Sequence, residues 1–186
     1  MTIFFTADTH FGHAGILSDR MHRPRPFASI EEHDETLIGV WNGRVCPGDQ
    51  VWHLGDFAYG ATADRTRDIF HRLNGTKHLI LGNHDSRRTT RLPWASQQDR
   101  AQVADRGFTF VVDHYAMRTW NGAHRGVLHL YGHSHGSLPG DGRSLDVGVD
   151  CWAWRPITTP EIAEALEETR AVKAGETAIR ALAQAA

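Results

Sequence analysis

The sequence predicts an α/β fold with a mixed β-sheet, and two observations lead to this prediction. Short apolar segments typical of strands alternate with amphipathic helices over the first half of the chain. A run of further strands follows. The helices are therefore expected to cover the outside of one sheet, or of two sheets packed together. The 186 residues suit a single domain spanning 1–186, and no repeat or linker divides them.

The expected strands are short and apolar, and most of them end in a polar loop. They lie at 2–8, 50–56, 77–83, 108–114, 126–133 and 144–150.

Three helices are expected, each with a recognisable start or stop signal. A helix over 29–43 has the capping box Ser29 and Glu32, and one over 62–75 ends at Gly75. A third, over 158–172, has Thr159 as its N-cap and Pro160 at the first helical position. We further expect a long loop over 11–28, a short helix within 95–107 and a frayed helix over residues 174–186.

The composition of the chain limits which binding partners and which cellular compartment are expected. The net charge of -2 argues against a broad nucleic-acid-binding face, and leaves room only for a local basic patch from Arg20, Arg23, Arg25, Arg87 and Arg88. Cys46 and Cys151 form no metal-binding pair and demand no disulfide, so a reducing cytoplasm is expected. No segment has the character of a signal peptide or a membrane span, and no membrane partner is expected.

Polar side chains cluster where five expected strands end, in "ADTH", "LGDF", "LGNHD", "DHY" and "YGHSHG". Ligand sites of open α/β sheets gather at the carboxyl ends of strands, so these side chains are expected to converge. The clusters supply seven oxygen and imidazole donors: Asp8, His10, Asp56, Asn83, His114, His133 and His135.

The donor types and their number indicate two metal ions. A mixed set of oxygen and nitrogen donors without thiolate suits Mn, Fe, Zn or Ni. A single catalytic ion needs about three protein ligands, so seven donors fit two ions if Asp56 bridges them. Two ions about 3.5–4 Å apart clamp the oxygens of a phosphoryl displacement and make hydroxide available near neutral pH.

Further residues of these clusters suggest roles around the ions. His84 follows Asn83 and is the expected proton donor to the leaving group, and Asp85 is expected to orient its imidazole. Gly55, Gly82 and Gly132 each precede a proposed ligand and would permit close backbone approach.

The ordered set "DTH … GD … GNHD … H … GHSH" resembles the calcineurin-like metallophosphoesterase superfamily. "DTHFGHAGI", "RPFAS" and "LDVGVDCW" are similar to features of its small bacterial and phage-type members. The resemblance implies a four-layer αββα sandwich of two mixed sheets with flanking helices. It also implies a dinuclear phosphoesterase that acts on diesters or monoesters through a metal-bridging hydroxide, with His84 assisting the leaving group.

The resemblance distributes the ligands between two divalent ions, for which Mn²⁺ is the expected metal and Fe, Zn or Ni are alternatives. One ion would be held by Asp8, His10, Asp56 and His135, and the other by Asp56, Asn83, His114 and His133.

Departures from the family pattern narrow the substrate. "GDFAYG" and "ILGNHD" lack the two arginines of the Ser/Thr protein phosphatases, which excludes that activity. A small phosphoester, including a nucleotide, is therefore expected, with His13 and Arg25 as its contacts. The alternatives are a nuclease that uses the same site and a non-catalytic metal-binding scaffold. An aromatic patch over 151–156 suggests a homodimer face.

Overall fold

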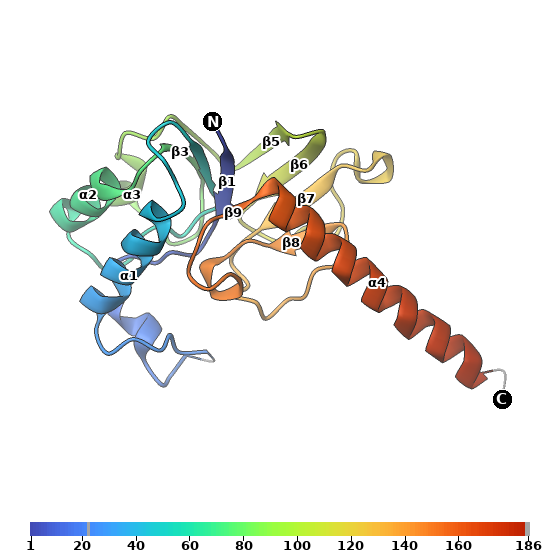
Figure 1. Ribbon diagram of the computed structural model, residues 1–186. Helices are drawn as coiled ribbons and strands as arrows, with labels where there is room; N and C mark the ends of the chain where they lie inside the picture. Colours follow the sequence, from blue (N-terminus) through green and yellow to red (C-terminus); the bar gives the residue numbers. More distant parts are fainter. Residues whose placement is uncertain (22, 185–186) are drawn as a thin grey trace.

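Two mixed β-sheets form the centre of the protein, shown in Figure 1 as a computed structural model. The structure describes residues 1–21 and 23–184. The strand order is β4-β3-β2-β1-β9 in the first sheet and β5-β6-β7-β8 in the second. This arrangement, with flanking helices, confirms the predicted α/β sandwich of two mixed sheets.

The first sheet is parallel except at one edge. It consists of β1 (Ile3–Thr6), β2 (Gln50–His53), β3 (Thr76–Ile80), β4 (Ser96–Gln98) and β9 (Ile157–Thr158). Strands β1 to β4 run parallel, and β9 pairs antiparallel with β1. The carboxyl ends of the four parallel strands therefore lie along one edge of the sheet.

The second sheet has the same mixed character. It consists of β5 (Arg100–Asp105), β6 (Phe108–Asp113), β7 (Leu128–Tyr131) and β8 (Ser144–Asp146). Strands β6, β7 and β8 are parallel, and β5 forms an antiparallel hairpin with β6.

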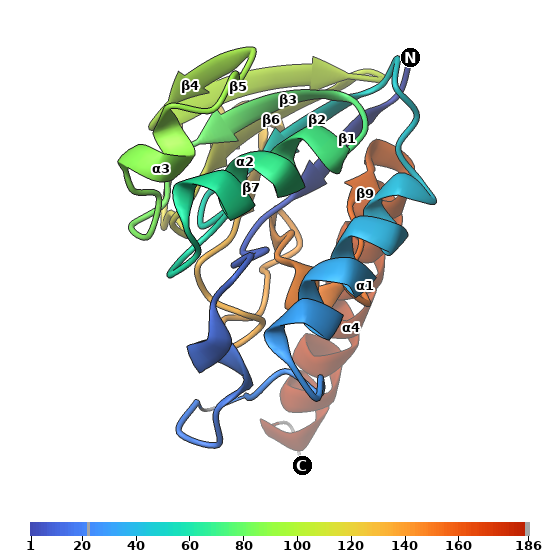
Figure 2. The ribbon, with the colours of Figure 1, turned by 90° about the vertical axis from the view of Figure 1, so that its left-hand side faces the viewer.

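The helices flank these sheets, with most of them on one side. They are α1 (Ile30–Asn42), α2 (Ala63–Arg72), α3 (Arg87–Thr90) and α4 (Thr159–Gln184), with 3-10 turns η1 (Ala14–Leu17), η2 (Ala123–Arg125) and η3 (Val149–Cys151). Figures 1 and 2 show α1, α2 and α3 beside the first sheet, whereas α4 starts next to β9 and its second half extends away from the body.

Two hydrophobic clusters hold the layers together. In the first, Leu37 and Trp41 of α1 and Ile69 of α2 pack with buried residues of β1, β2 and β3. In the second, the rings of Phe5 on β1 and Phe110 on β6 meet at 5.3 Å between the sheets. Burial of each such side chain contributes about 1.5–3 kcal/mol to the stability of the fold. The two clusters therefore hold the sheets in place, and with them the strand ends from which the polar loops begin.

The expected helix within 95–107 is wrong, because these residues form β4 and most of the β5–β6 hairpin. Val103 is buried between exposed neighbours, which is the alternation of a strand with one buried face. Arg106 and Gly107 both have positive φ and make the two-residue turn to β6.

Helix α4 also differs from the expectation. It is one helix from Thr159 to Gln184, so it includes the tail predicted as a separate frayed helix, and residues 185–186 lie outside the described part. Glu161 accepts hydrogen bonds from the backbone and hydroxyl groups of Thr158, both at 2.8 Å, and so caps the helix start. The hydroxyl of Thr159, the expected N-cap, donates instead to Asp105 of β5.

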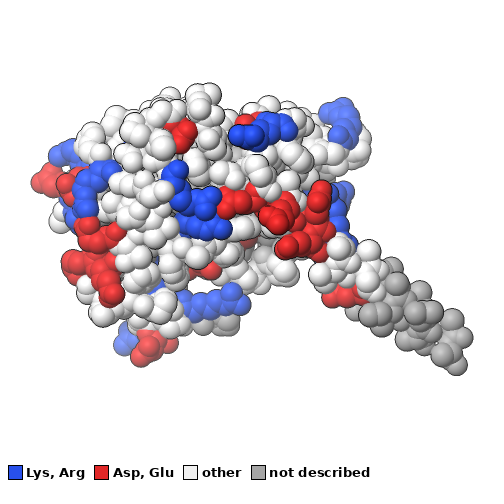
Figure 3. Space-filling view, in the orientation of Figure 1, with Lys and Arg blue, Asp and Glu red and all other residues white. Residues whose placement is uncertain are grey.

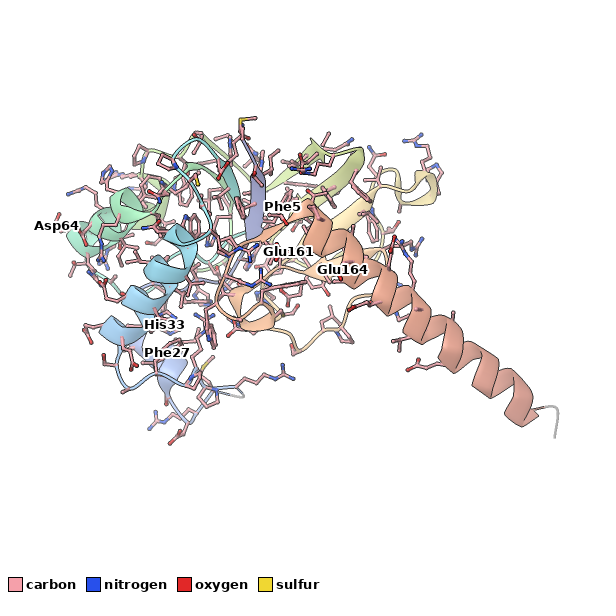
Figure 4. The ribbon with its side chains drawn as sticks, in the orientation of Figure 1. Phe5, Phe27, His33, Asp64, Glu161 and Glu164 are labelled. Atoms are coloured by element: carbon pink, nitrogen blue, oxygen red, sulfur yellow. The ribbon has the colours of Figure 1, made fainter. Side chains whose placement is uncertain are left out.

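Charges of both signs are interspersed on the face shown in Figure 3. Glu161, labelled in Figure 4 at the start of α4, pairs with both Arg44 and Arg155. No helix in the described part of the chain combines the length and the apolar character of a membrane span.

Candidate metal centre

The five polar clusters converge at one edge of the two sheets. Asp8, Asp56 and Asn83 follow β1, β2 and β3 of the first sheet. His114 follows β6, and His133 and His135 follow β7 of the second sheet. Because all five strands are parallel within their sheets, their carboxyl ends bring these side chains together.

Six of the proposed donors form two groups that could each hold a metal ion. In each group, one ligand atom per residue lies within 4.8 Å of the others. The first group is Asp8, His10 and His135, and the second is Asp56, His114 and His133. Each group takes residues from both sheets.

Asp56 lies between the two groups. Its Oδ2 atom is 3.6 Å from Nε2 of His10 in the first group and 3.5 Å from Nε2 of His114 in its own. Asn83 joins the second group, since its Oδ1 atom is 3.1 Å from Nε2 of His114. Asp56 is therefore within reach of both groups.

The chemistry of the donors fits divalent cations. Nε2 of His10 is buried and has no hydrogen-bond partner among the described residues, although buried polar atoms are almost always paired. Burial, and then the charge of Arg25, lowers the pKa of His10 well below its usual value, so the ring is neutral as a metal ligand must be. Burial and the nearby Asp146 and Asp56 raise the pKa of Asp8, a cost that a cation would offset.

Five of the proposed ligands have a strained backbone. Eight non-glycine residues of the described chain have positive φ, and five of them are Asp8, His10, Asp56, His133 and His135. Such a conformation costs of order 1–3 kcal/mol at a non-glycine residue and persists only where the surroundings enforce it. Its concentration here indicates that the loops hold these side chains in place at the expense of local stability.

Two glycines let the loops after β2 and β3 touch. A Cβ atom on Gly55 would lie 2.8 Å from Cα of Gly82, and one on Gly82 would lie 2.3 Å from Oδ1 of Asp56. No real side chain tolerates these distances, which confirms the close approach expected from the glycines that precede the ligands.

His84 is held beside the two groups by its backbone and its ring neighbours. Its backbone N–H donates to Oδ1 of Asp56 at 2.8 Å. Its ring packs edge-on against Tyr59, with centroids 4.6 Å apart, and lies 5.4 Å from the ring of His10. Sequence reasoning missed Tyr59, although "GDFAYG" places an aromatic residue three positions after a ligand.

Asp85 does not orient the His84 ring as expected. Its two carboxylate oxygens accept three backbone N–H groups, from Asp56, Phe57 and Gly82, each at 2.9 Å. Burial raises the pKa of Asp85 to about 6 in spite of these bonds. The residue ties the loop after β3 to the loop after β2, so its contribution to the site is architectural.

His13 lies next to the first group, where a substrate contact stays a prediction. Its Nδ1 atom is 3.3 Å from Nδ1 of His10, so one ring donates to the other. Its ring also packs edge-on against Tyr59 at 4.8 Å.

Relatives of known sequence show the family of this chain. No family model matches the chain. The gene 66 protein of Mycobacterium phage D29 is 32% identical over 182 residues, which cover 81% of this chain and 88% of that protein. This chain belongs to the family of the phage gene 66 protein. The uncharacterized protein MJ1445 of Methanocaldococcus jannaschii is 27% identical over 179 residues, which cover 92% of this chain and 94% of that protein.

One solved structure shows the same fold as this gene 66 family member. The protein of unknown function AQ665 from Aquifex aeolicus matches with a TM-score of 0.69 at 21% identity, over 88% of this chain and 98% of that one. A weaker match, with a TM-score of 0.45 and 16% identity, is Yfce, a phosphoesterase from E. coli, over 80% of this chain and 78% of that one.

In this gene 66 family member, Arg25 holds the backbone of the loop that carries the first ligands. It is therefore not the substrate contact that the sequence suggested. Its guanidinium donates to the backbone oxygens of Asp8 and Thr9, at 2.6 and 3.0 Å, and makes two bonds to Asp150, at 2.9 and 2.7 Å. Only 2% of Arg25 is exposed, so no donor is left for a substrate.

His33 of α1 also contacts Arg25. It is fully buried, with Nε2 2.9 Å from Arg25 and Nδ1 3.1 Å from Asp34. Figure 4 shows His33 at the start of α1 beside Phe27, whose ring centroid lies 5.2 Å away. These contacts fix Arg25 and Phe27 to α1.

Two acidic residues, Asp146 at the end of β8 and Asp150 just after it, hold the loop that carries His133 and His135. Asp150 lies 2.7 Å from Nδ1 of His135, so it fixes the ring with Nε2 free for a metal. Asp146 accepts the backbone N–H groups of Gly136 and Gly148. Neither was singled out from the sequence, although "LDVGVDCW" contains both.

The segment proposed as a dimer face contributes to packing in the monomer. Trp154 packs against Phe27 and under the guanidinium of Arg25, and the indole N–H of Trp152 donates to the backbone oxygen of Asp146. Both rings are partly buried, and the homodimer itself stays a prediction.

Proposed function

We propose that this protein is a calcineurin-like metallophosphoesterase with a dinuclear centre. The observation that carries the proposal is the position of Asp56, whose Oδ2 atom lies within 3.6 Å of a histidine from each ligand group. The seven ligands are Asp8, His10, Asp56, Asn83, His114, His133 and His135. Their order along the chain is that of the superfamily motifs.

Bound at this site, two ions would supply a nucleophilic oxygen near neutral pH and stabilise the charge of a phosphoryl group in transfer. The residues of the chain would do the rest. The ligands fix both ions relative to the sheets, and His84 delivers a proton from its imidazole N–H to the oxygen of the departing alcohol. The packing of Tyr59 against the His84 ring sets the direction from which that proton comes.

We propose Mn²⁺ as the native ion, with Fe, Zn or Ni as alternatives, because the donors are oxygens and imidazoles without thiolate. The substrate is a small phosphoester, diester or monoester, and nucleotides belong to this class.

Hydrolysis of aryl phosphates tests the proposal. The protein loaded with Mn²⁺ should hydrolyse bis(4-nitrophenyl) phosphate or 4-nitrophenyl phosphate and bind two ions per chain. Asp56→Asn should lower both the number of bound ions and the activity, because it removes the shared carboxylate. His84→Ala should keep two ions and lower kcat by about 10²–10⁴-fold on the dinucleoside phosphate TpT, whose alkoxide leaving group needs a proton; this is the usual contribution of general acid–base catalysis.

His71→Ala is the matched control, since His71 is exposed at the end of α2 and should leave ions and activity unchanged. Two bound ions without turnover on either ester would instead favour the metal-binding scaffold. Equal activity of the wild type and His84→Ala on TpT would refute the role of His84.

A further inference from the structure

A hollow lies beside the candidate metal centre on the side of His84. It has a volume of about 460 Å³ and is lined by Tyr59, Thr66, Ser86, Arg87, Arg88 and Thr89, among others. Tyr59 links it to the centre, because the same ring packs against His84 at 4.6 Å. Arg87 and Arg88 also line a second hollow of about 190 Å³, which continues to Arg67 and Arg91.

The arginines of these hollows are largely free to bind an anion. Within the described residues, the side chains of Arg87 and Arg91 have no hydrogen bond or ion pair. Arg88 uses one N–H to bond the backbone oxygen of Ala61 at 2.7 Å, which anchors its guanidinium at the rim. An arginine has five N–H donors, so the other four remain available.

The surroundings do not neutralise this positive charge. No Asp or Glu is among the residues that line either hollow in the described part of the chain. Asp64, labelled in Figure 4 at the start of α2, is mostly exposed and pairs with Arg67 at 2.9 Å, a surface contact that is worth little.

A buried hydroxyl in the larger hollow is a second, independent observation. Thr89 is fully buried, and its Oγ1 atom has no hydrogen-bond partner among the described residues. Buried hydroxyls are normally paired, so this unpaired group is a polar atom left over in a residue that lines the hollow.

We propose that the two adjoining hollows, which share Arg87 and Arg88, bind a second phosphate of the substrate, carried by the leaving group. The inference rests on the proposed function, because His84 marks the leaving-group side only if it protonates the departing oxygen. An alcohol that leaves towards His84 passes Tyr59 and reaches Arg87, Arg88 and Arg91, whose planar guanidinium groups match the geometry of phosphate oxygens. The substrate class is therefore a phosphoester whose departing alcohol carries a further phosphate.

Titration of inorganic pyrophosphate tests the subsite without any turnover. The full chain is kept in EDTA, so that no bound ion takes up phosphate, and binding is followed by calorimetry at low salt. The double variant Arg87→Ala/Arg91→Ala should bind pyrophosphate about tenfold more weakly than the wild type. Both residues are exposed, so the variant should fold normally.

Arg118→Ala/Arg125→Ala is the matched control. It removes the same charge from two exposed arginines outside both hollows. Equal weakening in the two double variants would show a general charge effect and overturn the subsite. Absence of binding by the wild type would overturn it as well.

A kinetic comparison identifies the source of the phosphate. The probes are the dinucleoside phosphate TpT and its terminally phosphorylated forms pTpT and TpTp, assayed with Mn²⁺. The form that carries its added phosphate on the departing nucleoside should exceed TpT in kcat/KM by about tenfold, and Arg87→Ala/Arg91→Ala should abolish this preference.

A site for a free anion would give a different result. The three probes would then react alike, and sulfate would change the TpT rate of the wild type but not of the double variant, which would overturn the assignment to substrate. If none of the probes is hydrolysed, the proposed function fails on this class, and the pyrophosphate titration still decides whether the hollows bind phosphate.

Discussion

The substitution Asp150→Asn should weaken one of the two proposed metal sites and leave the other intact. Asp150 accepts from three donors with two oxygens: Nδ1 of His135 at 2.7 Å, and Nε and Nη2 of Arg25 at 2.9 and 2.7 Å. Burial acts to raise the pKa of Asp150, but the bonds from His135 and Arg25 outweigh it and lower the value to about 2. The native group is thus a carboxylate, and Asn offers a single acceptor oxygen in its place.

The magnitude follows from the two partners. Removing the partner that orients a metal-bound histidine typically costs about 10–100-fold in metal affinity, or about 1.4–2.8 kcal/mol. Arg25 is buried and keeps its bonds to Asp8 and Thr9. The loss of stability should therefore lie near the lower end of the about 3–5 kcal/mol for breaking a buried ion pair.

Calorimetric titration of Mn²⁺ into chelator-treated protein measures the effect on each site. We expect the Mn²⁺ affinity of the site of Asp8, His10 and His135 to fall by about 10–100-fold. The site of His114 and His133 should keep its affinity. Asp141→Asn is the control, since Asp141 is exposed and, within the described residues, accepts from Arg143 and Ser144 alone. Unchanged affinity, or equal weakening of both sites, would refute the proposed action through His135.

Three further substitutions and one control variant test the core and the site. Burial lowers the pKa of His53 to about 3, so between this value and pH 6.5 the unfolded chain binds more protons. The free energy of unfolding should therefore be unaffected by His53 above pH 6.5 and lower by about 2 kcal/mol at pH 5. Denaturant unfolding in EDTA should show that the His53→Gln variant lacks this loss. Gly82→Ala would place Cβ 2.3 Å from Oδ1 of Asp56 and should abolish Mn²⁺ binding at that site in calorimetry. The control is Gly39→Ala, because Gly39 has open space around it in α1. This variant should bind Mn²⁺ normally, and its free energy of unfolding should rise by up to about 1 kcal/mol. Leu79→Ala, fully buried on β3, should destabilise by about 2–5 kcal/mol in urea unfolding, and a cost below 1 kcal/mol would contradict the assigned core.

The strand-end clusters were predictable because their signal is local. An apolar run followed by Gly and a polar residue is visible in the sequence, and parallel strands bring such ends together whatever the loops do. This is why the structure gathers Asp56, Asn83 and His133, each preceded by Gly, as expected from the sequence. The αββα layering was likewise expected, through the resemblance that these motifs carry.

Residues that act over long distances in sequence were not predictable. Arg25 reads as an exposed loop residue, and only the arrival of Asp150, 125 positions later, buries it. Asp85 follows His84 directly, yet its carboxylate turns back to the backbone of the β2 loop. The hairpin at Arg106 was missed because its turn lacks the usual Asn-Gly or Asp-Gly pair, and its Gln, Ala and Asp residues are poor strand formers.

The division of ligands between the two sheets has a mechanical consequence. Each proposed ion would take partners from both layers, so it would act as a cross-link that closes the sandwich at one edge while the Phe5–Phe110 contact closes its interior. Because a ligand that binds only the folded state stabilises by RT ln(1 + [L]/Kd), metal supply would set how tightly the layers stay joined there. Chelation should loosen this edge first, with faster amide exchange in the loops after β1, β2 and β7 than in the strands themselves.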